Sequence, residues 1–179
     1  MTKHDVPFTN AHHAWVASCL IACVVVSGAA LSWRDSRPSV ADWRLPLDHA
    51  TAALAAGDLP SARVAWEDAY RAAMGTRDPE GLLAAGAAAL RIGEAGERRG
   101  VAVAEARRLF LAAFLQARER EDAESMARAG EAFAELGDQE VAARAFTLAM
   151  ALATRRGDQA ARQRVAALMA RVGQPRPMP

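Results

Sequence analysis

Hydrophobic residues recur every three or four positions over most of the chain after residue 43, with polar residues between them. This period is typical of amphipathic α-helices, whereas side chains on a strand alternate at every second position. Gly57-Asp58, Gly137-Asp138 and Gly157-Asp158 interrupt the pattern, and each pair supplies a helix stop followed by a helix cap. The pattern predicts seven helices, near residues 43–56, 60–75, 79–95, 101–119, 122–136, 139–155 and 158–172.

A different pattern precedes these helices, because residues 14–33 contain no charged side chain. About 20 apolar residues are needed to cross a bilayer core of roughly 30 Å as a helix. Trp15 and Trp33 lie at the two ends, where amphipathic rings favour the membrane interface. We therefore expect an uncleaved transmembrane anchor at 14–33, after a tail at 1–13. A polar linker at 34–42 follows it, with helix-start chemistry at Asp42.

Three other interpretations of this segment stay open. Small residues at 27–30 would suit cleavage of a signal peptide. The stretch from Leu20 to Cys23 is similar to a lipoprotein-processing box, although the apolar run continues for ten residues past Cys23. A helix buried in the globular domain is the third interpretation, and the length of the run and its place before a polar linker argue against it.

Small residues on one side of the expected anchor point to a packing face. Small side chains let transmembrane helices approach closely, so we expect this side to pack against a span of a second copy or of a partner. Chance in a segment rich in Ala and Ser is the alternative. The residues are Ser18, Cys19, Ala22, Cys23, Ser27 and Ala30.

Flanking charges give an expectation for orientation. Arg34, Arg37 and Arg44 follow the segment, whereas Lys3 precedes it. The positive-inside rule then favours a cytoplasmic helical domain, although many anchored repeat proteins of bacteria take the opposite orientation. We expect a single-pass protein of the bacterial inner membrane.

Three segments of the chain share one arrangement: a helix, a Gly-containing turn, and a second helix with small and aromatic residues at fixed offsets. The matching residues are Ala50, Gly57-Asp58, Ala62 and Trp66 in the first; Gly86, Ala106 and Phe110 in the second; Gly130, Gly137-Asp138, Ala142, Phe146 and Ala149 in the third.

This arrangement resembles the tetratricopeptide repeat family, whose unit is about 34 residues of helix–turn–helix. The resemblance predicts an all-α fold, with the anchor followed by an α-solenoid of about three helix pairs. The expected parts are repeats at 43–76, 79–120 and 123–156, a capping helix at 157–172 and a disordered tail at 173–179.

The second segment departs from the family pattern. It contains about eight extra residues around 94–104, with Gly93, Gly96 and Gly100 among or beside them. Glycine punctuates helices, so the insertion either lengthens the helical pair or forms a projecting loop that could be a contact site.

The resemblance also implies a partner-binding groove lined by the first helix of each pair. The groove would be apolar at one end and acidic at the other, which suits an apolar or basic helical segment; merely solvated helix faces are the alternative. The main candidates are Leu47, Thr51, Leu54, Leu83, Leu90, Arg91, Glu124, Glu131 and Glu135, beside Arg44, Ala55, Glu80, Ala87, Ala127 and Ala134.

One ligand class of the family is not expected. Members that bind chaperone tails hold a terminal carboxylate with Lys and Asn at groove positions. Those positions here are Leu47, Thr51, Leu83 and Ala87, which argues against a carboxylate clamp.

Composition excludes several further functions. The 22 basic and 21 acidic side chains leave a formal charge of +1, so no net field favours nucleic acid. His12-His13 has no Cys, Asp or Glu at metal-ligand spacing, and no phosphate loop or nucleophile elbow is present. We therefore expect no cofactor, no metal and no enzymatic activity.

The remaining function is interaction with a protein. We expect a membrane-anchored scaffold or adaptor that holds a protein partner, for instance during assembly of a membrane complex. Alternatives are an accessory structural subunit of a larger membrane complex and an envelope protein released by signal cleavage. Three repeats are near the minimum for a stable stack, so self-association or a permanent partner could supply further buried surface.

Overall fold

The computed structural model describes residues 43–173. Within this range the chain forms seven α-helices and no strand, which confirms the all-α prediction, and every helix boundary lies within two residues of the predicted one. The helices are α2 (Arg44–Ala55), α3 (Leu59–Thr76), α4 (Pro79–Ala95), α5 (Arg99–Glu119), α6 (Ala123–Glu135), α7 (Gln139–Arg155) and α8 (Gln159–Gly173).

The anchor expected at 14–33 and its packing face of Ser18, Cys19, Ala22, Cys23, Ser27 and Ala30 lie outside the described residues. Among the helices from α2 to α8, none combines the length and the apolar character needed to cross a membrane.

All six turns between the described helices share one backbone geometry. Each contains a residue with positive φ, which is Gly at three turns and Arg77, Glu97 or Glu121 at the others. An Asp follows this residue at five of the six turns. At four of them the carboxylate accepts a hydrogen bond from the backbone N–H three residues ahead, which satisfies a free donor of the new helix. Only the three Gly-Asp turns were predicted.

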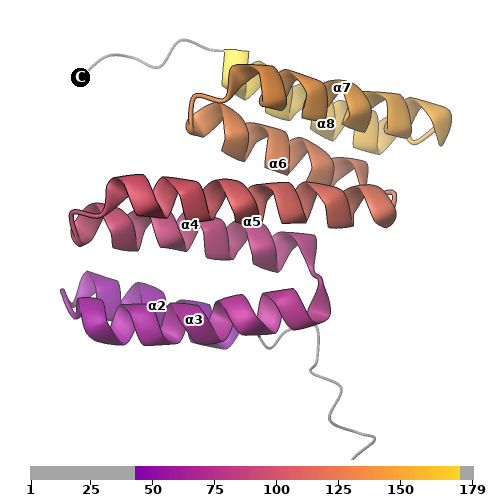
Figure 1. The fold of residues 1–179 in the computed structure, drawn as a ribbon. Helices are drawn as coiled ribbons and strands as arrows, with labels where there is room; N and C mark the ends of the chain where they lie inside the picture. Colours follow the sequence, from indigo (N-terminus) through magenta and orange to yellow (C-terminus); the bar gives the residue numbers. More distant parts are fainter. Residues whose placement is uncertain (1–42, 174–179) are drawn as a thin grey trace, which may run out of the picture. The chain divides into compact units, whose positions relative to one another are not determined.

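The helices stack as hairpins. Helices α2 and α3, α4 and α5, and α6 and α7 pack as consecutive pairs, with the α4–α5 pair between the other two (Figure 1). The first helices also contact one another in the order α2, α4, α6 and α8. This is a solenoid-like arrangement. We call the surface of α2, α4, α6 and α8 the first-helix face, and that of α3, α5 and α7 the second-helix face.

The insertion in the second pair lengthens both of its helices. Helix α4 has 17 residues against 13 in α6, and α5 has 21 against 17 in α7. Each helix thus gains four residues, about one turn, and the two gains account for the eight inserted residues. The added turns touch closely, because a Cβ at Gly93 would lie 2.1 Å from the Ala102 Cβ. Of the two predicted outcomes, the longer helical pair is therefore observed.

The residues that recur in the sequence lie where helices meet. Ala62, Ala106 and Ala142 are 0–1% exposed, and Phe110 and Phe146 are also buried. Small side chains let the backbones approach, and the two aromatic rings fill the space between helices. The core is continuous from α2 to α8 as a result.

Candidate partner-binding face

The nine main groove candidates all lie on first helices, three each on α2, α4 and α6. A furrow between α4 and α6 brings four of them together, namely Leu83, Leu90, Glu131 and Glu135. The others are spread along the face: Leu47 and Leu54 are half-buried on α2, and Glu124 lies at the contact of α6 with α8.

The furrow between α4 and α6, here called the inner furrow, has a volume of about 250 Å³. Its apolar lining includes Leu83, Ala87 and Leu90, and the buried ring of Phe110 also contributes. Leu83 is itself buried in the core, whereas Ala87 is exposed. Glu80, Arg128, Glu131 and Glu135 supply the charged part of the lining. The furrow can therefore take up a small apolar side chain between charged borders.

The charges on this face pair with one another across neighbouring helices. Glu80 of α4 contacts Arg44 of α2 at 2.8 Å and Arg128 of α6 at 3.9 Å. Arg91 donates to the Thr51 hydroxyl at 2.9 Å, so two groove candidates contact each other directly. These contacts join α2 to α4 and α4 to α6.

The acidic end of the predicted groove lies beside the last helix. Arg164 of α8 pairs with Glu124 at 2.6 Å, and Arg171 of α8 pairs with Glu131 at 2.7 Å. The sequence predicted a capping helix at 157–172, and α8 packs on α6 as the first helix of a further unit would. Both arginines remain half-exposed, so each pair contributes only roughly 0–1 kcal/mol. The negative field expected at this end is largely compensated.

A buried carboxylate joins the first two helix pairs. Asp78 is 9% exposed and accepts hydrogen bonds from the Trp43 indole N–H at 2.7 Å and from the backbone N–H of Gly81 at 3.3 Å. The Arg120 guanidinium lies 3.9 Å away and donates to the carbonyl of Thr76. Such a network satisfies a carboxylate that would be costly to bury alone.

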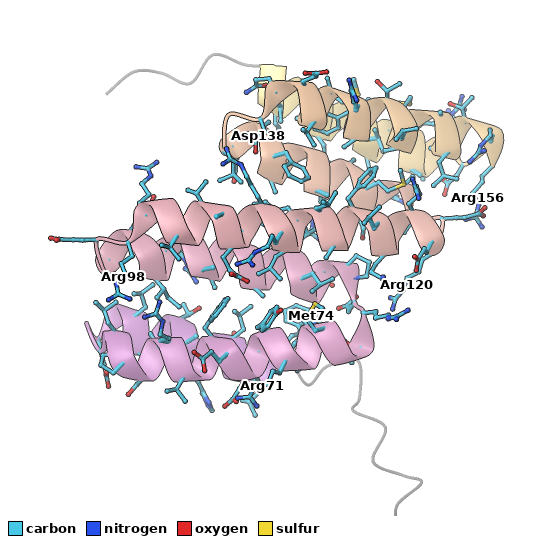
Figure 2. All side chains as sticks on the ribbon, in the orientation of Figure 1. Arg71, Met74, Arg98, Arg120, Asp138 and Arg156 are labelled. Atoms are coloured by element: carbon cyan, nitrogen blue, oxygen red, sulfur yellow. The ribbon has the colours of Figure 1, made fainter. Side chains whose placement is uncertain are left out.

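The same edge of the stack repeats this arginine contact one unit later. Arg156 donates to the carbonyl of Glu121 at 2.9 Å and pairs with its carboxylate at 3.3 Å. Arg120 and Arg156 both project at this edge (Figure 2). Neither arginine was predicted to join helix pairs, although the sequence has an Arg two positions before an Asp at both 120–122 and 156–158.

The opposite edge contains a bidentate ion pair. Nε and Nη2 of Arg107 donate to the two carboxylate oxygens of Asp138 at 2.7 and 2.8 Å, and these hydrogen bonds raise the pKa of Arg107 above its ordinary value. Asp138 directly precedes α7 and makes no side-chain cap hydrogen bond, because its carboxylate is engaged by Arg107 of α5. This ion pair also joins α5 to the start of α7, and so links the second helix pair to the third.

Residues 43–173 contain no group of three or more His, Cys, Asp and Glu side chains that could hold a metal ion. The His12-His13 pair lies outside this range. The polar side chains named above serve caps and ion pairs between helices, and the inner furrow is a part of the first-helix face that is open to a ligand.

Comparisons of the chain with protein-family models, with curated proteins and with solved structures found no match. The described residues therefore define the protein only at the level of its fold, which is all-α and solenoid-like.

Proposed function

We propose that this chain is a membrane-anchored helical-repeat protein of the tetratricopeptide kind that holds a protein partner on its first-helix face. The inner furrow is the observation that supports this most directly. It brings together groove candidates from two successive first helices, including Leu90 and Glu135. A non-enzymatic scaffold or adaptor is the proposed role.

The proposed partner is a helical segment that inserts an apolar side chain between α4 and α6. Ala87 leaves room in the lining, while Leu83, Leu90 and Phe110 provide apolar contact. Helix-in-groove recognition uses such apolar anchors. Because Glu124 and Glu131 are already paired with Arg164 and Arg171, apolar contact rather than attraction of a basic partner is proposed as the main contribution.

The test is a variant that blocks the furrow without disturbing the core. Ala87 is exposed, so Ala87→Arg adds a long side chain to the furrow and leaves the helix pairs in place. Ala104→Arg is the matched control, since Ala104 is an exposed alanine of α5 that does not line the furrow. The full chain would be affinity-purified from detergent-solubilised membranes of the native cells, and partners quantified by mass spectrometry.

We expect a partner that is retained by the Ala104→Arg variant and depleted at least ten-fold by Ala87→Arg. Equal recovery of every partner by both variants would remove the proposed site. Charge reversal at Glu131 is a poorer test, because it also breaks the pair with Arg171 on α8.

Membrane anchoring is a separate part of the proposal and rests on the uncharged run at 14–33. Alkaline extraction of membranes should leave the chain in the pellet, and amino-terminal sequencing should find an unprocessed start. A mature chain that begins after residue 27 would replace the anchor by a cleaved signal.

A further inference from the structure

The lengthened second pair forms one side of a pocket between α3 and α5, here called the α3–α5 pocket. Helix α4 closes its base, and its volume is about 460 Å³, which is within the range of small-molecule sites. Trp66, Ile92 and Val101 supply apolar walls. The pocket shares no lining residue with the inner furrow.

A small residue at the base explains why this space is open. In the third pair, Phe133 lies three positions after Gly130, is buried and contacts the ring of Phe110 in the preceding pair. The residue three positions after Gly86 in the second pair is Ala89, which lines the pocket. The space that a phenyl ring fills between the second and third pairs is therefore available between the first and second.

The aromatic wall of the pocket is held in a fixed orientation. The indole N–H of Trp66 donates to the carbonyl of Ala85 at 2.8 Å. The Trp66 ring also stacks on Tyr70, with 5.6 Å between ring centroids. A wall that is already ordered loses little conformational freedom when a ligand binds.

An arginine at the pocket has an equivalent one pair later. Arg107 follows Ala106 in α5 and binds the Asp138 carboxylate through two hydrogen bonds. Arg63 follows Ala62 in α3 in the same way and lines the pocket. The repeat therefore shows how a carboxylate is bound by an arginine at this position.

The chain supplies no such carboxylate to Arg63. Ala102 takes the place of Asp138, because each lies four positions before the small residue at which the second helix touches the first. The insertion starts α5 at Arg99, so this position lies inside the helix, and Ala102 is packed against Gly93. An acid from outside the chain could bind Arg63 instead.

The remaining charges of the lining favour one negative group. Arg98 lies at the end of the second pair, on the side of the first pair (Figure 2). Within residues 43–173, the side chains of Arg63 and Arg98 make no ion pair or hydrogen bond. Glu105 is engaged by Arg108, which leaves two guanidinium groups and the carboxylate of Glu67 at the pocket. Glu67 disfavours a second negative charge on the ligand.

We propose that the α3–α5 pocket binds a small organic acid with one carboxylate and an apolar body. Its carboxylate lies between Arg63 and Arg98, as the Asp138 carboxylate lies on Arg107, and its apolar body lies against Trp66. Guanidinium groups suit this role because they bind carboxylates with two parallel hydrogen bonds. The inference does not depend on the partner proposed for the inner furrow.

The experiment is calorimetric titration of the detergent-solubilised full chain with phenylbutyrate and with its uncharged amide, phenylbutyramide. We expect the acid to bind with a Kd of about 1 mM or lower. The amide should bind at least about ten-fold more weakly, since a charged hydrogen bond contributes a factor of that size.

Two exposed arginines of α3 separate the site from general charge attraction. Arg63→Gln should remove the preference for the acid, and because Arg63 is exposed the core is left intact. Arg71→Gln is the matched control, since Arg71 is exposed and does not line the pocket, and it should retain the preference. Ala89→Phe should abolish binding of both compounds, because it fills the base of the pocket.

Equal affinity for acid and amide, no detectable binding of the acid, or a preference that survives Arg63→Gln would each overturn the proposal. If phenylbutyrate does not bind but Arg63→Gln depletes a protein in the affinity purification, the pocket holds a protein side chain and the small acid is wrong. Ala87 lies outside this pocket, so failure of the inner-furrow proposal can be recognised separately.

Discussion

At the scale of single residues, the absence of a side chain is as important as its presence. Gly86 faces the buried ring of Phe110, and a Cβ there would lie 2.4 Å from its Cε1 atom. Gly130 is less constrained, since its Cβ would lie 3.2 Å from that of Ala145. Both positions require a small residue for the same reason, because the second helix of the pair passes directly over them.

Gly86→Ala should lower the free energy of unfolding by about 1–2 kcal/mol, as measured by urea denaturation. The ring of Phe110 is 2% exposed and has little room to move, so the overpacking outweighs the helix propensity gained, about 1 kcal/mol. Gly75→Ala is the control, because no atom lies within 4 Å of its added Cβ, and it should stabilise by about 0.5–1 kcal/mol. Equal gains in both variants would contradict this account.

At the scale of elements, the start of α2 is fastened to the start of α4. Trp43 is buried against Gly81, its N–H donates to Asp78, and the Arg44 guanidinium lies 4.4 Å from the centre of the Trp43 ring. Trp43 precedes the first turn of α2 without capping it through its side chain. Contact with the next pair therefore positions this helix end.

Trp43→Phe should cost about 1–3 kcal/mol, because the buried carboxylate of Asp78 loses a donor. Trp66→Phe is the matched comparison, since the Trp66 indole N–H donates at 2.8 Å to the neutral carbonyl of Ala85, and its cost should be smaller. In the double variant Trp43→Phe/Asp78→Asn the losses should be less than additive, because the residues are in contact. Thermal unfolding of the unmodified chain, the two single Trp variants, Asp78→Asn and the double variant provides the measurement, and additive losses would show that Trp43 and Asp78 act independently.

At the scale of the whole molecule, each helix pair depends on its neighbours. Val165 and Leu168 of α8 are buried, and Arg164 and Arg171 pair with α6. In a repeat stack, stability is approximately a sum of units and of the contacts between neighbours. Loss of α8 should therefore weaken α6 and α7 first.

A chain that ends at Arg156 should lose hydrogen-exchange protection mainly in α6 and α7, and much less in α2 and α3. A chain that ends at Gly173 is the control and should retain the protection of the full chain. Uniform loss along all the helices would indicate a single cooperative unit and contradict the nearest-neighbour account.

The sequence by itself determined the local features: seven helices, their ends, and the positions where helices touch. These follow from hydrophobic period, Gly-Asp turns and small residues, which act over a few neighbouring positions. The all-α prediction was confirmed for the same reason. Turns without glycine, such as Arg77-Asp78, were not predicted because positive φ at Arg is uncommon.

Only the tertiary structure decided how distant side chains meet. The eight inserted residues are divided equally between α4 and α5. The Asp138 carboxylate accepts hydrogen bonds from Arg107 instead of capping α7. Helix α8 packs beside the acidic residues of α6 and pairs with two of them. The tertiary structure also revealed an apolar groove between α5 and α7, whose residues looked like ordinary helix surface along the chain. The physical reason is distance along the sequence. These contacts join residues some 30 to 40 positions apart, and the stacking of complete helices sets their geometry.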